Sequence, residues 1–84
     1  MEKNKIKNKL VKYVLEKSDV DDVNEIPLDE SLLITGILDS FAVVELTIFI
    51  ESEWGIVIED SDFTAEKMGS INKMVNLINF KINK

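Results

Sequence analysis

The residues of this chain that could do chemistry are few, and Ser40 has the most distinctive setting among them. It lies in the run G-I-L-D-S-F, directly after Asp39 and shortly after Gly36. The chain contains no histidine and no cysteine, and its ten cationic residues are all lysines. The commonest general base, the thiolate nucleophile and the residue best suited to clamping phosphate are therefore missing. We expect no enzymatic activity and no metal site.

Ser40 is predicted to stand in the first turn of a helix. Asp39 is a good N-cap residue, so the helix should begin at Asp39 or Ser40. The serine hydroxyl should then be accessible, beside unpaired N–H groups and the positive end of the helix macrodipole. A phosphate attached there would be well placed. Taken alone, however, an Asp-Ser pair is very common at helix starts, and a simple capping role for Ser40 is then the better explanation.

The helices that must position Ser40 are visible as apolar residues at helical spacing. We expect longer helices over about residues 2–17, 39–54 and 70–82, and a brief one ending near Lys67 that Asp62 or Thr64 caps. A length of 84 residues fits one domain, residues 1–84. The predicted fold is all-α: a four-helix bundle with three longer helices, one short helix and a long loop between helices 1 and 2.

That long loop, about residues 19–38, contains the only proline, Pro27, which breaks a helix. A connection of this length is unusual in a compact domain unless it packs or functions. We expect an ordered loop with a short helical turn near residues 29–34 and a positive φ at Gly36. Its apolar residues should be buried and should pin it: Leu28, Leu32, Leu33 and Ile34.

The helix after Ser40 is apolar on two sides. One stripe, which we expect in the core, consists of Leu46, Phe49, Ile50 and Trp54. The other is Phe41, Val44 and Ile48. A surface helix needs only one apolar stripe, so either loop leucines or a partner protein must cover the second. Glu45 and Glu51 lie beside the second stripe, which makes it a candidate docking surface for a basic, apolar groove.

The net charge of −6 is unevenly distributed. All ten cations lie outside residues 19–66, whereas fourteen of the sixteen acids lie within them. This segment should repel nucleic acid and anionic membranes and attract basic proteins, unless it is only a solvated face. The apolar runs are short, so we expect no membrane span, no signal peptide and a cytoplasmic protein.

The stretch from Leu33 to Ile78 resembles acyl carrier proteins. The resemblance lies in L-L-I-T-G-I-L-D-S-F-A-V-V-E-L, E-W-G-I-V-I-E-D-S-D-F and A-E-K-M-G-S-I-N-K-M-V-N-L-I. It implies that a phosphopantetheinyl transferase attaches 4'-phosphopantetheine from coenzyme A to Ser40, with Asp39 helping to present the serine. The arm's thiol would carry an acyl group as a thioester, so the carrier, a monomer, would need no cysteine.

The resemblance also implies partners and their docking surface. A loading enzyme and downstream acyltransferases would act on the thioester. Recognition would fall to residues beside the arm: Phe41, Val44, Glu45, Ile48 and Glu51.

The cargo is less clearly indicated than the arm. Typical fatty-acid carriers have Asp-Ser-Leu and a following acid, whereas Phe41 and Ala42 follow Ser40 here. Phe49 stands where a smaller residue is usual, which suggests a reduced internal cavity. The pattern is more similar to stand-alone carriers of D-alanylation and secondary metabolism, with aminoacyl or short acyl cargo. The alternatives are a general fatty-acid carrier and, from another class, a non-carrier helical adaptor. A calcium-binding role is disfavoured, because no Asp-x-Asp-x-Asp-Gly loop is present.

Overall fold

The computed structural model describes residues 3–83, and over these residues the chain is helical with no strand. The elements are α1 (Lys3–Lys17), η1 (Val23–Glu25), α2 (Ser40–Trp54), η2 (Asp60–Asp62), α3 (Ala65–Met68) and α4 (Ile71–Ile82), where η denotes a short 3-10 helix. The predicted all-α fold with three longer helices, one short helix and a long first loop is confirmed. The predicted start of the first helix at Glu2 lies outside the described residues.

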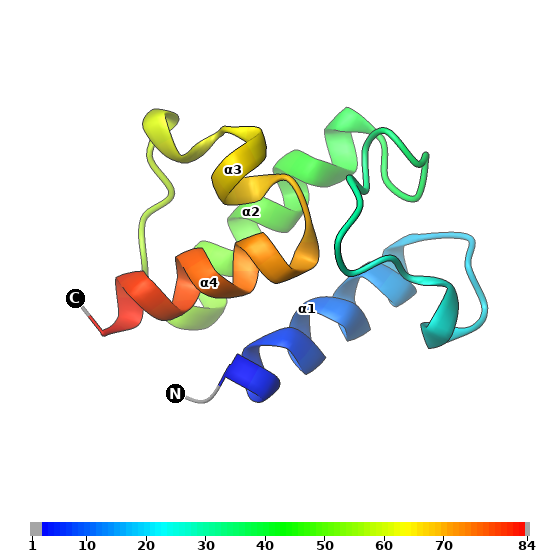
Figure 1. Cartoon of the computed structure of the whole chain (residues 1–84), viewed down its shortest axis with the longest axis horizontal. Coiled ribbons are helices and arrows are strands. Elements are labelled where there is room, and N and C mark those ends of the chain that lie inside the picture. The colour runs from blue at the N-terminus through cyan, green and yellow to red at the C-terminus, as the bar shows by residue number, and fades with distance from the viewer. Residues whose placement is uncertain (1–2, 84) are drawn as a thin grey trace.

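α1 and α4 lie side by side and run in opposite directions, with α2 behind them and α3 above α4 (Figure 1). The first turn of α1 and the last turn of α4 are at one end of the molecule. α2 begins at the other end, where the long loop also lies. The arrangement therefore separates the start of α2 from both ends of the described chain.

The core is formed by the apolar stripes of the three long helices. Its fully buried apolar side chains are Ile6, Leu10, Val14, Leu46, Ile50, Ile71 and Ile78. They are four residues apart in α1 and α2 and seven residues, or two turns, apart in α4, which is why each helix turns one face inward. Burying a side chain of this size stabilises a fold by about 1.5–3 kcal/mol before the entropy of ordering is counted.

The long loop is ordered by a few anchors. Leu32 and Leu38 are buried, and the backbone N–H of Asn72 at the start of α4 donates to the carbonyl of Leu28 at 2.9 Å. Asn72 also donates from Nδ2 to Asp29 at 2.8 Å. Where a short helix near residues 29–34 was expected, the structure has hydrogen-bonded turns, and it adds the unpredicted η1.

Two predicted anchors of the loop were wrong. Leu33 is 50% exposed and Ile34 is 88% exposed, whereas Leu28 is half-buried and Leu32 is buried as expected. The reason is the turn itself: the amide of Thr35 donates to the carbonyl of Ser31 at 3.0 Å, and this reversal points only one of three consecutive apolar residues inward.

The segment after α2 is held by two carboxylates. Gly55 ends α2 in the left-handed conformation with φ 63°, as a C-terminal glycine should. Glu51 then accepts a hydrogen bond from the amide of Ile58 at 2.9 Å, and Ile58 is buried. Further along, the buried Asp62 accepts from the amide of Glu59 and pairs with Lys81 of α4 at 2.9 Å.

Candidate functional site

The start of α2 presents Ser40 outward. Asp39 is the N-cap, and its Oδ1 accepts a hydrogen bond from the amide of Ala42 at 2.8 Å. Gly36 has φ 80°, as predicted, and this turn lets Leu38 enter the core two residues later. Ser40 follows as the first helical residue and is exposed. The buried Leu38 and the capping Asp39 therefore fix the chain on the loop side of the serine.

The capping interpretation of Ser40 is wrong, because Asp39 provides the cap. Ser40 can therefore change chemically without loss of the hydrogen bond that starts the helix. A phosphate ester on its Oγ would lie at the positive end of α2, beside the first-turn amide groups. An exposed serine hydroxyl followed by an ordered helix is thus a fitting attachment point for a phosphate-linked arm.

One apolar stripe of α2 is uncovered. Phe41 is 71% exposed, Val44 57% and Ile48 61%, and we call these three residues the α2 stripe. The alternative that the loop leucines Leu32 and Leu33 cover it is wrong, because all three side chains of the stripe are mainly exposed.

The two glutamates beside the α2 stripe differ. Glu45 is exposed, whereas Glu51 is half-buried and is engaged by the amide of Ile58. A docking role for Glu51 stays a prediction, and the structure gives this residue a bond of its own within the fold.

A shallow hollow of about 340 Å³ lies between α1 and α2 on the same side as the α2 stripe. It is lined by Tyr13, Glu45, Ile48, Phe49 and Ser52, and we call it the α1–α2 hollow. The rings of Tyr13 and Phe49 are stacked with centroids 4.3 Å apart, and Trp54 meets Phe49 edge-on at 5.9 Å. Burial, and then the charge of Glu45, raise the pKa of Tyr13.

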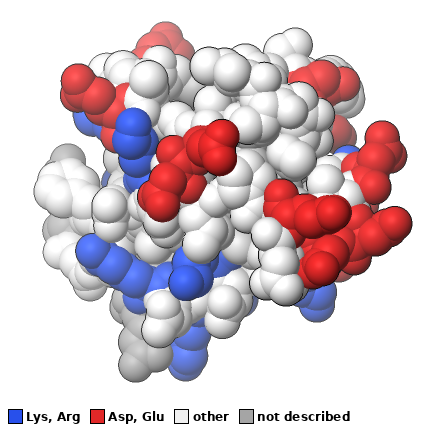
Figure 2. Space-filling model, turned by 45° about the vertical axis from the view of Figure 1, so that its right-hand side comes forward, with Lys and Arg blue, Asp and Glu red and all other residues white. Residues whose placement is uncertain are grey.

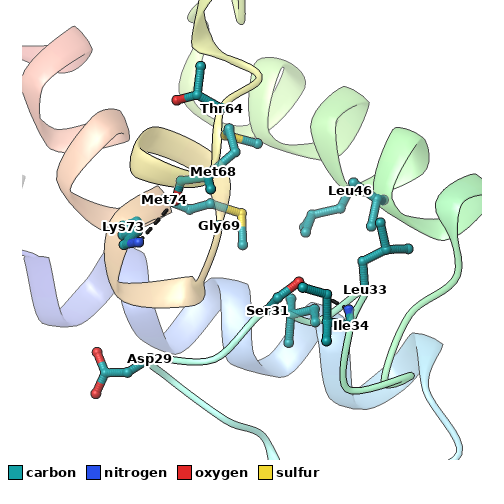
Figure 3. Close-up of a pocket in the computed structure, with 13 residues that line it drawn as sticks. Asp29, Ser31, Leu33, Ile34, Leu46, Thr64, Met68, Gly69, Lys73 and Met74 are labelled. Carbon is teal, nitrogen blue, oxygen red and sulfur yellow. Dashed lines mark hydrogen bonds between the residues drawn. The ribbon is translucent and has the colours of Figure 1, made fainter.

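A second, more apolar groove of about 370 Å³ lies between the long loop, α2, α3 and the start of α4. Figure 3 shows Leu33, Ile34 and Leu46 on one side of it and Met68 and Met74 on the other. We call it the loop–α3 groove. Lys73 lies at its edge and donates to the carbonyl of Ala65 at 3.0 Å. Its volume is within the range of small-molecule pockets.

Phe49 does not line the loop–α3 groove, so the reduced internal cavity stays a prediction. Phe49 is half-buried against Tyr13 on the α1 side of α2, whereas the groove is lined by Val43 and Leu46 of that helix.

Acidic and basic side chains are unevenly distributed over the surface. In Figure 2, the largest group of carboxylates lies at the right of the view, others lie at the centre and beside lysines at the upper left, and most lysines lie along the lower part. Lysines of α1 account for six of the ten cations in the sequence. No helix within residues 3–83 is both long and apolar enough to cross a membrane.

Comparisons with known proteins identify the family to which the chain belongs. No protein-family model matches the chain. An acyl carrier protein of Petrotoga mobilis is 34% identical over 83 residues, which covers 99% of this chain and 94% of the relative. A D-alanyl carrier protein of Streptococcus suis is 35% identical over 63 residues (75% and 78%), and one of Bacillus velezensis is 33% identical over 70 residues (83% and 88%).

The chain belongs to the acyl carrier protein family. It is a carrier protein, and within the family it stands nearer to D-alanyl carriers than to housekeeping fatty-acid carriers. Its relatives are named as carriers and not as catalysts.

The sequence did not show that the α1–α2 hollow and the loop–α3 groove would form, because some of their lining residues carry no local signal. Tyr13 of α1 lies at the helical spacing of the core residues Ile6, Leu10 and Val14 and has no distinguishing pattern around it; in the structure the ammonium of Lys17, one turn later, is 5.6 Å from its ring centroid. Met68, Met74 and Lys73 gave no signal, because the loop–α3 groove is assembled from segments distant in sequence.

Proposed function

We propose that this protein carries an aminoacyl or short acyl group as a thioester on a 4'-phosphopantetheine arm attached to Ser40, in a D-alanylation-like or other specialised pathway. The observation that carries the proposal is the exposed Ser40 at the start of α2, with Asp39 and not Ser40 acting as the cap. The arm supplies the thiol that this cysteine-free chain lacks. Enzymes that load and unload the thiol do the chemistry, and we place this exchange in the cytoplasm.

The arm is attached by transfer of the phosphopantetheinyl group from coenzyme A to Ser40. The Oγ of Ser40 forms a bond to the phosphorus that bears the pantetheine, and the phosphoanhydride bond of coenzyme A breaks. Adenosine 3',5'-bisphosphate leaves, and the serine proton passes to a base of the transferase. In this reaction Asp39 keeps the first turn of α2 formed, and the α2 stripe supplies an apolar surface to the transferase.

Incubation of the protein with coenzyme A and a broad-specificity phosphopantetheinyl transferase tests the attachment by mass spectrometry. We expect the wild-type protein to gain the mass of one phosphopantetheine unit and Ser40→Ala to gain none. Ser61→Ala, which alters another exposed serine, is the matched control and should gain the same mass as wild type. If wild type gains no mass, or if Ser40→Ala gains as much as wild type, the proposal is contradicted and the alternative of a non-carrier helical adaptor is favoured.

A general fatty-acid carrier is the second candidate, and the loop–α3 groove is the observation that favours it. Leucine, isoleucine, valine and methionine side chains supply most of the wall, which suits an aliphatic chain better than a charged amino acid. Mass spectrometry of the protein isolated from its native host distinguishes the two. An aminoacyl or short acyl thioester is expected, and a long saturated acyl chain on the arm would contradict the specialised pathway.

A further inference from the structure

The α1–α2 hollow has no role in the site so far described, although it opens beside the α2 stripe. We infer that it is a socket for the phosphopantetheinyl transferase, receiving an apolar side chain of that enzyme flanked by a lysine or arginine that pairs with Glu45. This inference rests on the proposed function, because it names how the enzyme that modifies Ser40 is recognised. It extends the docking surface from α2 onto α1.

The walls of the hollow suit an apolar side chain. Tyr13 and Phe49, both half-buried, line it with their stacked rings, and Ile48 adds an aliphatic side chain. Ile48 belongs to both the hollow and the α2 stripe, so a partner that covers the stripe also covers the opening. Aromatic and aliphatic side chains in such pockets supply much of the energy of protein–protein contacts.

The rim of the hollow carries charge of one sign on the α2 side. Glu45 is exposed there, and its charge contributes to the raised pKa of Tyr13 across the hollow. On the α1 side, Lys17 places its ammonium 5.6 Å from the ring centroid of Tyr13.

A basic residue of the partner is therefore attracted at Glu45 and repelled at α1. Such paired attraction and repulsion sets the orientation of a docked protein more than its affinity.

The distance along α2 is compatible with one enzyme reaching both places. Ser52, on the rim of the hollow, lies twelve residues beyond Ser40, or about 18 Å along the helix axis. This is within the span of an ordinary protein–protein interface, so the transferase can hold the hydroxyl of Ser40 in its active site while it fills the hollow.

Filling the hollow from its rim tests the socket without removing a packed side chain. Ser52→Tyr places a ring at the opening, and Asn76→Tyr places the same ring on an exposed position of α4 as the matched control. The measurement is the rate of arm attachment as a function of apo-protein concentration. We expect Ser52→Tyr to raise the KM for the carrier about tenfold with kcat within about twofold of wild type, and Asn76→Tyr to leave both unchanged.

Charge reversal tests the flanking basic residue. Glu45→Lys should raise the KM about tenfold, whereas Glu66→Lys, an equal change on exposed α3, should raise it by less than about twofold. Thermal melting of each variant shows whether it is folded, and amide cross-saturation from the transferase to Tyr13 and Ile48 reports contact directly in wild type.

The outcomes separate the two proposals. A wild-type protein that gains no arm contradicts the proposed function. A wild-type protein that is modified, with Ser52→Tyr and Asn76→Tyr alike in KM and no cross-saturation at Tyr13, overturns the socket while the attachment at Ser40 stands.

Discussion

Ser40 differs from the other serines near helix and turn starts in what its hydroxyl is needed for. Ser18, Ser31 and Ser70 each accept a hydrogen bond from a nearby backbone amide through Oγ, so each is used by the fold. At the start of α2 Asp39 does this work, which leaves Ser40 exposed. Asp39 therefore makes Ser40 suitable for modification, because it provides the cap in place of the serine.

Phe41 is expected to matter for partners and little for stability. Because its side chain is 71% exposed, Phe41→Asp should change the free energy of unfolding by less than about 0.5 kcal/mol. The same variant should slow arm attachment, because it places a charge within the α2 stripe. Chemical denaturation and the transferase assay measure the two effects. Leu46→Ala, on the buried side of α2, is the contrast and should cost about 2–5 kcal/mol.

Trp54 illustrates how burial was overestimated from the sequence. It was expected in the core, where truncation of such an aromatic costs about 3–5 kcal/mol. The structure leaves it half-buried near the end of α2, edge-on to Phe49. We expect Trp54→Ala to cost about 1–2 kcal/mol in urea unfolding, because only part of its apolar surface is removed from water. A loss as large as that of Leu46→Ala would contradict this.

At the scale of elements, α2 depends on its cap. Asp39→Ala should destabilise the fold by about 1 kcal/mol, because the amide of Ala42 loses its partner. Asp39→Asn keeps an oxygen in the same place and should restore most of that stability. Melting temperatures check the capping role. Both variants remove the negative charge of Asp39. If arm attachment is slow in both, that charge also contributes to recognition by the transferase.

The long helices could be predicted from the sequence because their signals are local. Asp39 and Gly55 bracket α2, and Ser70 caps α4 through the amide of Lys73, so the boundaries were right to within about a residue. The loop could not be predicted in the same way. Whether Leu33 or Leu32 turns inward depends on the turn between Ser31 and Thr35, and propensity does not specify which residue of an apolar run faces the core.

The candidate site likewise has a part that could be predicted from local sequence and a part that could not. Ser40 and the α2 stripe are consecutive or helically spaced, so the sequence showed them together. The α1–α2 hollow and the loop–α3 groove are each lined by side chains from two or more segments, so no local sequence pattern predicts them.

At the scale of the whole molecule, the buried carboxylate of Asp62 connects η2 to α3 and α4. Asp62 accepts from Lys81 at 2.9 Å, from the amide of Glu59 at 2.9 Å and from Lys67 at 3.4 Å. Its hydrogen bond with Lys81, followed by that with the Glu59 amide, lowers its pKa below the usual 3.8. A carboxyl with a lower pKa in the folded state stabilises the fold above its unfolded pKa, and this contribution is lost as the pH falls through the folded value.

We therefore expect Asp62→Asn to be less stable than wild type at neutral pH, with the difference shrinking below a pH of about 4. Urea unfolding from neutral to acidic pH measures it. Asp60→Asn, an exposed change in the same short helix, should follow the wild-type profile. A constant difference between wild type and Asp62→Asn at every pH would show that the amide alters packing and not titration.

The relative placement of the chain ends has a practical consequence. The first turn of α1 and the last turn of α4 lie together at one end of a molecule whose longest extent is 35 Å, and α2 begins toward the other (Figure 1). A tag, a linker or a solid support joined near either chain end would therefore leave the exposed Ser40 directed into solution. Fusion at both ends at once is also geometrically permitted, so the domain can be inserted as a module in a longer polypeptide without covering the serine.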